Sequence, residues 1–448
     1  MRETKESIMR LSSAAGREPA DLLLAGALLL AVGLLFYLGL ARHALEPLLL
    51  ALHREGWRRI VLEPALVLGY LGLGLSALRV ALWAAYRPVA CASHAEAPML
   101  TVVIPAYNEG AMVARSIDSV AGADYPPGRL QVLAVDDGSR DDTWEHMQRA
   151  AARHPGIVRT LRFAANRGKR AALAAGFREA RGEVLVTIDS DSVIEPGTLL
   201  AMVAPFRDAR VGAVAGRVAV LNRFQGLIPR MLHVRYALSF DFLRAAQSTL
   251  GNVVCCPGAL SAYRASAVRR ALPAWLDQRF LGQPCTIGED RAMTNHMFEL
   301  GYDVRYQSNA VVHTMAPTSY RGLCRMFLRW SRSQLREDWR LLGLLGSRPL
   351  PARLVAGLEL LATDLGYVFG LGALALAAHA AVGEPRVLGY MAAAVALGAA
   401  PGALYFLRME RSMEWLYGLA YGYFSALALF WIMPYAAVTV RARGWLTR

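Results

Sequence analysis

Long apolar runs occupy both ends of the chain, whereas the middle alternates short apolar stretches with polar ones. Five runs are each long enough to cross a bilayer: residues 21–41, 60–85, 365–382, 387–407 and 416–440. We therefore predict a membrane region with two helices over residues 1–97, and a second with about three helices over residues 351–448. The segment between them has the composition of a soluble domain, which we place at residues 98–317.

The middle segment has the pattern of strands that alternate with helices. Strands are expected at four short apolar stretches: Met99–Pro105, Leu130–Val135, Val158–Phe163 and Val184–Asp189. Helices of about 10–15 residues fit between them, which is typical of an α/β domain with a parallel sheet. Because ligands of such sheets bind beyond the carboxyl ends of the strands, the polar residues that follow each strand are candidates for a binding site.

Two aspartates follow the fourth expected strand, in the stretch IDSDS. Residues two apart on a strand point to the same face, so Asp189 and Asp191 are expected side by side. Like charges that lie close together repel unless a cation lies between them. Carboxylate oxygens suit Mg²⁺ or Mn²⁺ shared with phosphates. The pair therefore predicts a divalent cation site for a phosphorylated ligand.

Two other polar motifs follow the second and third expected strands. Asp136 and Asp137 begin the turn DDGSRDDT, in which helix capping accounts for Ser139 and Asp141 but not for the first two carboxylates. These carboxylates could accept hydrogen bonds from a base or a ribose. The stretch NRGKR around Lys169 precedes an alanine-rich helix, and it fits either a capped helix start or an anion site.

Two motifs in the second half of the domain also contain candidate residues. In IGEDR, Glu289 and Asp290 open an apparent helix. Acidic residues at this position either stabilise the first turn of the helix or supply a general base. In CCPGALSAYR, Gly258 permits close approach of a substrate to the backbone.

The stretch SYRGLCRMFLRWSRSQLREDWRL is expected to form one long helix. Five arginines recur three or four residues apart and so share one face: Arg321, Arg325, Arg329, Arg332 and Arg336. We interpret residues 318–350 as amphipathic helices at the membrane surface. One or two of the arginines, together with Trp330, could still reach the site.

Charge and composition limit the classes of partner. The chain of 448 residues has a formal net charge of +14, which fits either arginines beside membrane helices or an anionic substrate. No nucleic-acid-binding motif occurs, so no nucleic-acid partner is expected. The absence of GxGxxG and GxxxxGK[ST] motifs disfavours a dinucleotide or P-loop site. The five cysteines form no CxxC pattern, which favours reduced thiols.

The motifs VVIPAYNE, VDDGS, NRGKRAALAAG, IDSD, CCPGALSAYR, GEDR and LRWSRS occur in this order. This ordered set resembles the processive family 2 glycosyltransferases, a group with hyaluronan synthase, chitin-oligosaccharide synthase and cellulose synthase. The resemblance covers about residues 100–340 and the flanking membrane helices. It implies an A-type glycosyltransferase fold, a Rossmann-like α/β architecture, in a cytosolic domain flanked by transmembrane helices.

The resemblance also implies roles for the residues at the strand ends. Asp137 would hold the uridine of a UDP-sugar, with Tyr107 and Lys169 nearby. Asp189 would meet the nucleotide or its diphosphate, and Asp191 would bind the metal, Mg²⁺ or Mn²⁺.

Further roles are implied for the later motifs. Asp290 would be the base that takes a proton from the acceptor hydroxyl. MFLRW resembles the QxxRW motif of the family, so Arg329 would contact the diphosphate and Trp330 would lie near the acceptor, although Met326 replaces the glutamine. The stretch around Gly258 resembles the acceptor segment of the hyaluronan and chitin-oligosaccharide enzymes, with Pro-Gly-Ala in place of their usual Gly-Pro.

The resemblance implies a multi-pass protein of the inner (plasma) membrane that polymerises sugars with inversion, from α-linked donors to a β-linked chain. The donors would be UDP-GlcNAc alone or together with UDP-glucuronate, and the growing polysaccharide would pass through the lipid bilayer. Two alternatives remain. A non-processive transferase that loads one sugar onto a polyprenyl phosphate or lipid would share the nucleotide motifs. A receptor or channel that senses a nucleotide would also bind one, but it would not need GEDR.

Overall fold

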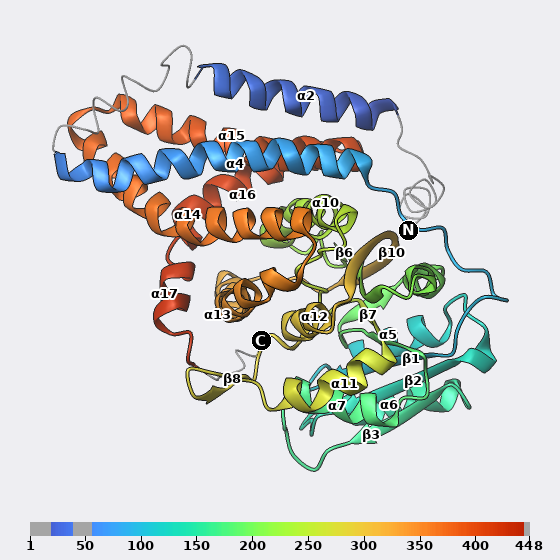
Figure 1. Ribbon diagram of the computed structural model, residues 1–448. Coiled ribbons are helices and arrows are strands. Elements are labelled where there is room, and N and C mark those ends of the chain that lie inside the picture. The colour runs from blue at the N-terminus through green and yellow to red at the C-terminus, as the bar shows by residue number, and fades with distance from the viewer. Residues whose placement is uncertain (1–18, 39–55, 443–448) are drawn as a thin grey trace.

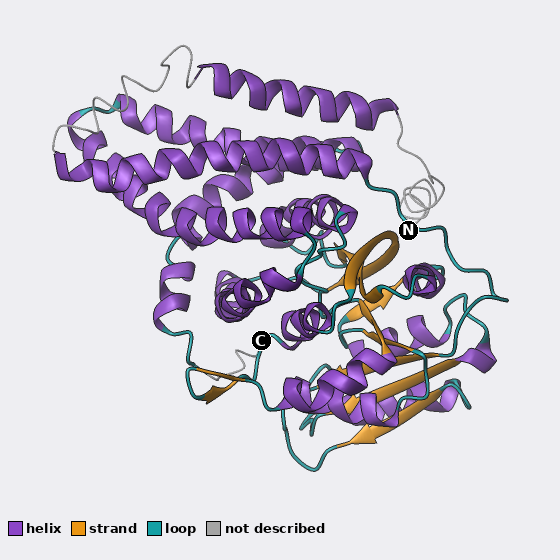
Figure 2. Ribbon diagram, in the orientation of Figure 1, coloured by secondary structure: helices purple, strands orange, loops and turns teal. Residues whose placement is uncertain are grey.

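The computed structural model describes residues 19–38 and 56–442. Figure 1 shows the long helices from the two ends of the chain gathered above a domain that contains the sheet. Figure 2 shows that the strands lie apart from these long helices, with shorter helices on both sides of the sheet. The soluble-type domain and the apolar helices therefore form two adjoining layers.

Three helices in the described residues are long and apolar enough to cross a membrane: α4 (Arg59–Ala85), α14 (Leu350–Gly383) and α15 (Arg386–Glu410). They coincide with three of the five apolar runs, although α14 begins well before residue 365. The run at 416–440 is not one straight helix, because α16 (Leu416–Phe424) and α17 (Ile432–Val438) belong to a pair of segments bent by 43°. The first run corresponds to the shorter helix α2 (Pro19–Phe36), and residues 39–41 of that run lie outside the described residues.

The domain is built on one sheet of eight strands in the order β3-β2-β1-β4-β7-β6-β10-β5. The strands are β1 (Leu100–Ala106), β2 (Leu130–Asp136), β3 (Val158–Arg162), β4 (Val184–Thr187), β5 (Ser192–Ile194), β6 (Val211–Val220), β7 (Ser261–Arg264) and β10 (Asp303–Thr314). The first four are parallel neighbours, as the sequence predicts. Strand β7 runs antiparallel between β4 and β6, so the sheet as a whole is mixed. A separate hairpin pairs β8 (Arg279–Phe280) with β9 (Gln283–Pro284).

The parallel register brings the candidate motifs to one edge of the sheet. Ala106 at the end of β1 lies opposite Asp136 at the end of β2, and Asp136 lies opposite Arg162 at the end of β3. Every residue of β1 is buried, which anchors this edge in the core. The loops that leave β1, β2, β3 and β4 therefore meet at the same place, as expected for an α/β sheet.

Helices cover both faces of the sheet. They are α5 (Met112–Ala121), α6 (Thr143–Arg153), α7 (Lys169–Glu179), α8 (Thr198–Val203), α9 (Leu227–Ala237), α10 (Leu243–Thr249), α11 (Ala265–Leu276), α12 (Glu289–Glu299) and α13 (Tyr320–Leu344). The core on one face continues into the apolar helices: the ring of Phe242, just before α10, lies 5.6 Å from Trp83 of α4 and 5.2 Å from Tyr405 of α15. The two layers are thus packed together through aromatic side chains.

Helix α13 packs against both α12 and α17. Two of the five arginines that we expected on an exposed basic face of this helix are therefore buried. Arg332 and Arg336 are each 5% exposed. Arg332 donates to the hydroxyl of Thr439 at 2.9 Å, and Arg336 donates to the backbone oxygen of Ile287 at 2.7 Å. A buried guanidinium requires such partners. These two arginines therefore do not lie on a membrane surface, whereas Arg321 is exposed.

Candidate active site

Three of the sequence motifs meet at the ammonium group of Lys169. This residue begins α7, and its Nζ atom lies 2.6 Å from Oδ1 of Asp189 and 2.8 Å from Oε1 of Glu289. Asp189 follows β4, and Glu289 begins α12. A Cβ atom on Gly258 would lie 2.8 Å from the same Nζ, so the fourth motif approaches the ion pairs closely and a larger residue there would displace the ammonium group.

Asp189 is thus paired with a lysine in this structure, and the strand before it is shorter than expected. Strand β4 ends at Thr187, two residues earlier than predicted, so the alternation of a strand does not govern the residues that follow. Asp189 contacts Lys169 of α7, whereas Oδ1 of Asp191 accepts a hydrogen bond from Thr314 of β10 at 3.1 Å. The two carboxylates therefore meet different elements of the fold.

Charge compensation decides the protonation of the buried groups. Burial alone would lower the pKa of Lys169, but the carboxylates of Asp189 and Glu289 raise it above its usual value. Burial would likewise raise the pKa of Glu289, but Lys169 lowers it below its usual value, and the positive charge of Arg329 acts in the same direction. Lys169 and Glu289 are therefore both charged at neutral pH.

Asp290 is the carboxyl group of the site whose pKa is shifted toward neutral pH. Burial and the neighbouring charge of Glu289 raise the pKa of Asp290 to about 6, while Lys169 opposes that rise. The backbone N–H of Arg291 donates to Oδ1 of Asp290 at 2.7 Å, and that of Gly258 donates to Oδ2 at 3.2 Å. A carboxylate that is held in place and titrates near neutral pH has the properties of a general base.

Asp137 organises the loop that leads to Lys169. Its Oδ1 accepts a hydrogen bond from the backbone N–H of Arg167 at 2.8 Å, and its Oδ2 accepts from the N–H of Gly168 at 2.8 Å and from the side chain of Asn166 at 3.0 Å. Burial raises the pKa of Asp137, and the two backbone hydrogen bonds oppose that rise. This geometry gives Asp137 a structural role, and the contact with uridine stays a prediction.

Tyr107 follows β1 and lies near the turn that contains Asp137. It is half-buried, and the adjacent Asn108 is linked to that turn: its N–H donates to the hydroxyl of Ser139 at 3.0 Å, and its side-chain oxygen accepts from the N–H of Arg140 at 2.9 Å. Asn108 has a φ of 53°, in the left-handed region. The loops after β1 and β2 are therefore bound to each other, but no contact places Tyr107 against Lys169.

The residues around Asp191 fit a shared divalent cation. The side chain supplies a hard carboxylate donor and is 9% exposed. No group of three or more potential ligands among His, Cys, Asp and Glu occurs in residues 19–38 and 56–442. Mg²⁺ is often held by one or two carboxylates together with phosphates of the substrate, so a single carboxylate at this edge agrees with such a site.

Arg329 and Trp330 lie on helix α13, and the charge of Arg329 acts on Glu289. The Trp330 ring packs among aromatic side chains, with centroid distances of 6.4 Å to Tyr236, 6.2 Å to Phe240 and 5.6 Å to Phe327. Met326, which replaces the glutamine of the family motif, accepts from the hydroxyl of Tyr236 at 3.9 Å through its sulfur. The motif therefore builds an aromatic cluster against α9 and the segment that follows it.

A small pocket adjoins the charged residues. It is lined on one side by Lys169, Asp189, Gly258, Glu289 and Asp290. Its apolar wall consists of Pro105, Leu173, Phe177, Tyr263, Trp275 and Met293. The apolar wall excludes water from one side of the charges, which strengthens their interactions.

Sequence reasoning missed two groups of residues at the site. Thr314, at the end of β10, contacts Asp191, but a threonine that ends a strand far along the chain gives no signal in the sequence. Tyr236 and Phe240 contact Trp330 from a helical segment whose apolar residues look like ordinary core. Only the folded arrangement brings these segments to the motifs.

Comparison with known proteins identifies relatives of the domain. Residues 101–272 match Glycosyl transferase family 2. The chain is 35% identical over 250 residues to an N-acetylglucosaminyltransferase of Bradyrhizobium diazoefficiens, covering 55% of this chain and 51% of that protein. It is 36% identical over 244 residues to a hyaluronan synthase of Streptococcus pyogenes, covering 53% and 58%. The chain thus spans about half the length of these relatives.

A solved structure shares the fold. The mannosyltransferase PcManGT from Pyrobaculum calidifontis, in complex with GDP-Man and Mn²⁺, matches with a TM-score of 0.57 at 22% identity. The match covers 81% of this chain and 99% of that one. The likeness confirms the predicted A-type glycosyltransferase fold.

Proposed function

Since residues 101–272 form a family 2 glycosyltransferase domain, we propose that this chain is a membrane-embedded transferase that builds a β-linked polysaccharide from UDP-sugars. The observation that carries the proposal is the convergence of Lys169, Asp189, Gly258 and Asp290 on one small pocket. These residues come from four motifs that are far apart in the sequence. A structural role for each motif alone would not require them to meet.

The donor side of the proposed reaction uses positive charge. Lys169 is the first residue of α7, and the N-terminus of that helix favours an anionic group such as a diphosphate. Arg329 adds positive charge, which acts on Glu289 of the same site. A divalent cation at Asp191 would neutralise the charge that develops on the departing diphosphate.

The acceptor side uses Asp290. Above about pH 6 its carboxylate is ionised and can accept the proton of an acceptor hydroxyl. The hydroxyl oxygen forms a bond to the anomeric carbon while the bond from that carbon to the diphosphate oxygen breaks. The proton stays on Asp290, and UDP carries the bonding electrons away. One displacement of this kind inverts an α-linked donor to a β-linked product.

The aromatic cluster and the apolar helices suit a growing chain. Trp330 and Phe240 are partly exposed and offer ring faces on which a sugar can stack, with the buried Tyr236 packed behind them. The domain packs directly against α4 and α15, and in this proposal the product passes through the membrane beside these helices. We place the protein in the inner membrane with the domain in the cytosol, where UDP-sugars occur. The named relatives favour UDP-GlcNAc, alone or with UDP-glucuronate.

Product size tests the proposal. Purified full-length protein is incubated with Mg²⁺ or Mn²⁺ and radiolabelled UDP-GlcNAc, with and without UDP-glucuronate, and the products are separated by size and digested with linkage-specific hydrolases. We expect a polymer from one of the two mixtures, and none from Asp290→Asn. Asp118→Asn serves as the control and should retain activity, because Asp118 of α5 is partly exposed and pairs with Arg153 of α6. A single sugar on a lipid would instead identify a non-processive transferase.

A further inference from the structure

Helices α12 and α13 hold each other through polar side chains along their contact. Near the start of α12, the backbone oxygen of Ile287 accepts a hydrogen bond from Arg336 at 2.7 Å. Farther along, Asn295 donates to the side chain of Glu337 at 2.9 Å and to its backbone oxygen at 3.0 Å. Asn295 and Glu337 are each 1% exposed. Such buried polar contacts define one register between the two helices.

The two helices also approach very closely just before α12 begins. Gly288 has a φ of +77°, and a Cβ atom there would overlap the side chain of Ser333 on α13. Only glycine satisfies both the backbone conformation and the space. The approach lies two residues before Asp290, so the position of the carboxylate depends directly on α13.

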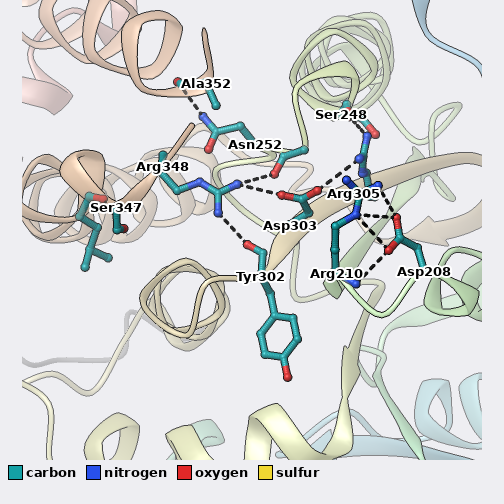
Figure 3. Close-up of polar contacts among 12 residues, drawn as sticks. Asp208, Arg210, Ser248, Asn252, Tyr302, Asp303, Arg305, Ser347, Arg348 and Ala352 are labelled. Carbon is teal, nitrogen blue, oxygen red and sulfur yellow. Dashed lines mark hydrogen bonds and ion pairs between the residues drawn. The ribbon is translucent and has the colours of Figure 1, made fainter. Parts of the chain in front are cut away.

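The connection between α13 and α14 fixes the other end of α12. Figure 3 shows Arg348 pointing toward the residues that follow α12. Its guanidinium donates to the backbone oxygen of Tyr302 at 2.8 Å and to that of Gly251 at 3.0 Å, and it pairs with Asp303 at 3.3 Å. Helix α12 is therefore fastened at both ends to one continuous segment, residues 320–348.

One ion pair in this contact adjoins Asp290. Arg291 pairs with Asp338 of α13, and the side chains are 15% and 3% exposed. The backbone N–H of Arg291 also donates to Oδ1 of Asp290 at 2.7 Å. The same residue thus holds the carboxylate through its backbone and holds α13 through its side chain.

We propose that Arg291 and Asp338 are positioning residues for Asp290. They lock the first turn of α12 to the helix that carries Arg329 and Trp330. The proton acceptor then keeps a fixed placement relative to the residues expected at the diphosphate and the acceptor sugar. This inference rests on the proposed function, because it assigns the pair a task in the same reaction.

Kinetics of two variants test the pair. In full-length protein, Asp338→Asn removes the charge while keeping the shape, and Arg291→Lys keeps the charge while losing the planar fork. We expect kcat for UDP release from UDP-GlcNAc to fall about 10- to 100-fold in Asp338→Asn, because small misplacements of reacting groups slow the chemical step. The fall should be smaller in Arg291→Lys. KM for the donor and the Kd for UDP should stay within about twofold of wild type, because the pair lies apart from the nucleotide loops.

The same interface supplies a matched control. Arg340 pairs with Glu299 at 2.6 Å near the far end of α12, where Glu299 is half exposed. Glu299→Gln should leave kcat within about twofold of wild type, since exposed ion pairs contribute little. Should Asp338→Asn fail to fold, as judged by gel filtration and UDP binding, Arg291→Lys decides by the same separation of kcat from KM.

The outcomes separate the two proposals. Normal kcat in a folded Asp338→Asn, or in Arg291→Lys where the first variant does not fold, overturns the positioning role. A loss of kcat that is matched by an equal loss of UDP binding overturns it as well, because it indicates general damage. A wild-type protein that releases no UDP from any UDP-sugar overturns the proposed function, and the positioning role with it.

Discussion

Two pairs of adjacent acidic residues in this domain are held in different ways. At the end of β2, Asp136 accepts a hydrogen bond from the N–H of Ser139 at 2.9 Å and pairs with Arg162 at 3.1 Å, while Asp137 accepts from the loop at 166–168. At the start of α12, Glu289 meets the ammonium of Lys169, and Asp290 accepts hydrogen bonds from two backbone N–H groups.

The difference separates structural carboxylates from those poised for chemistry. Asp137 accepts hydrogen bonds from three donors of one loop, at residues 166–168, so these bonds define the shape of that loop. The charge of Glu289 is compensated by a side chain, and its negative field raises the pKa of its neighbour Asp290 to about 6. The α12 pair thus combines one permanently charged group with one that exchanges a proton in the physiological range.

Removal of the exchanging carboxylate should have the largest effect. Asp290→Asn should lower kcat for sugar transfer roughly 10²–10⁴-fold, the usual contribution of a general base. The unfolding free energy at pH 7 should change little, because removal of a buried charge whose pKa is raised offsets the loss of one acceptor for a backbone N–H group. Steady-state UDP release and denaturant unfolding measure the two quantities. Activity near the wild-type level would contradict the assignment.

Loss of the shared ammonium should be next in size. Lys169→Ala leaves the carboxylates of Asp189 and Glu289 without their cation, and Glu289 is 6% exposed. Removal of one partner of a buried ion pair costs about 3–5 kcal/mol, so the unfolding free energy should fall by that order. KM for the donor should rise as well. A variant of unchanged stability and unchanged KM would show that the cluster is not held by this charge.

Asp137→Asn tests the structural member of the comparison. An asparagine keeps one acceptor oxygen, whereas Asp137 accepts from two backbone N–H groups with different oxygens. We expect the unfolding free energy to fall by about 1–3 kcal/mol, the cost of leaving a buried group unpaired. The loss of stability should be larger than that of Asp290→Asn, because Asp137 accepts from three donors and Asp290 from two. Equal unfolding free energies in the two variants would contradict the distinction between a structural carboxylate at Asp137 and a catalytic one at Asp290.

The smallest effect is expected at Met326, which stands where the family motif has a glutamine. Met326 lies against Tyr236 in the aromatic cluster, and methionine positions tolerate substitution. Met326→Gln should change kcat by less than about threefold, as for substitutions away from buried charges. A change of tenfold or more in either direction, measured in the same assay, would place this residue in direct contact with substrate.

The sequence predicts the first half of the sheet well because its signals are local. The four parallel strands, the helices between them and the polar loops at their ends follow from alternation and turn residues. The later strands escape this reasoning, since β7 runs antiparallel between β4 and β6, and the partner of Asp191 comes from β10. Strand pairings between segments a hundred residues apart leave no periodic pattern of apolar residues in the sequence.

The sequence predicts which residues belong to the site better than it predicts how they are arranged. Lys169, Asp189 and Asp290 belong to separate sequence motifs, and the fold brings them to one pocket. The sequence does not predict the lysine bridge, because it led us to expect the nucleotide or its diphosphate at Asp189 and the metal at Asp191. The buried state of Arg332 and Arg336 also depends on α12 and α17, which an isolated helical face does not reveal.

The pH dependence of kcat tests most directly whether Asp290 takes the proton. The pKa of Asp290 is raised from 3.8 to about 6, so the carboxylate loses its ability to accept a proton as the pH falls through that value. Because the folded state then binds more protons than the unfolded chain between about pH 4 and 6, stability should also fall as the pH rises through that window. Asp290→Asn should lack this change.

At saturating donor, wild-type kcat should fall on the acidic side with a midpoint near pH 6. Glu289→Gln should move that midpoint to lower pH, because it removes the negative charge that raises the pKa of Asp290. The residual activity of Asp290→Asn should show no such midpoint. An acidic limb that persists unchanged in Asp290→Asn would assign the proton to another group and contradict the account.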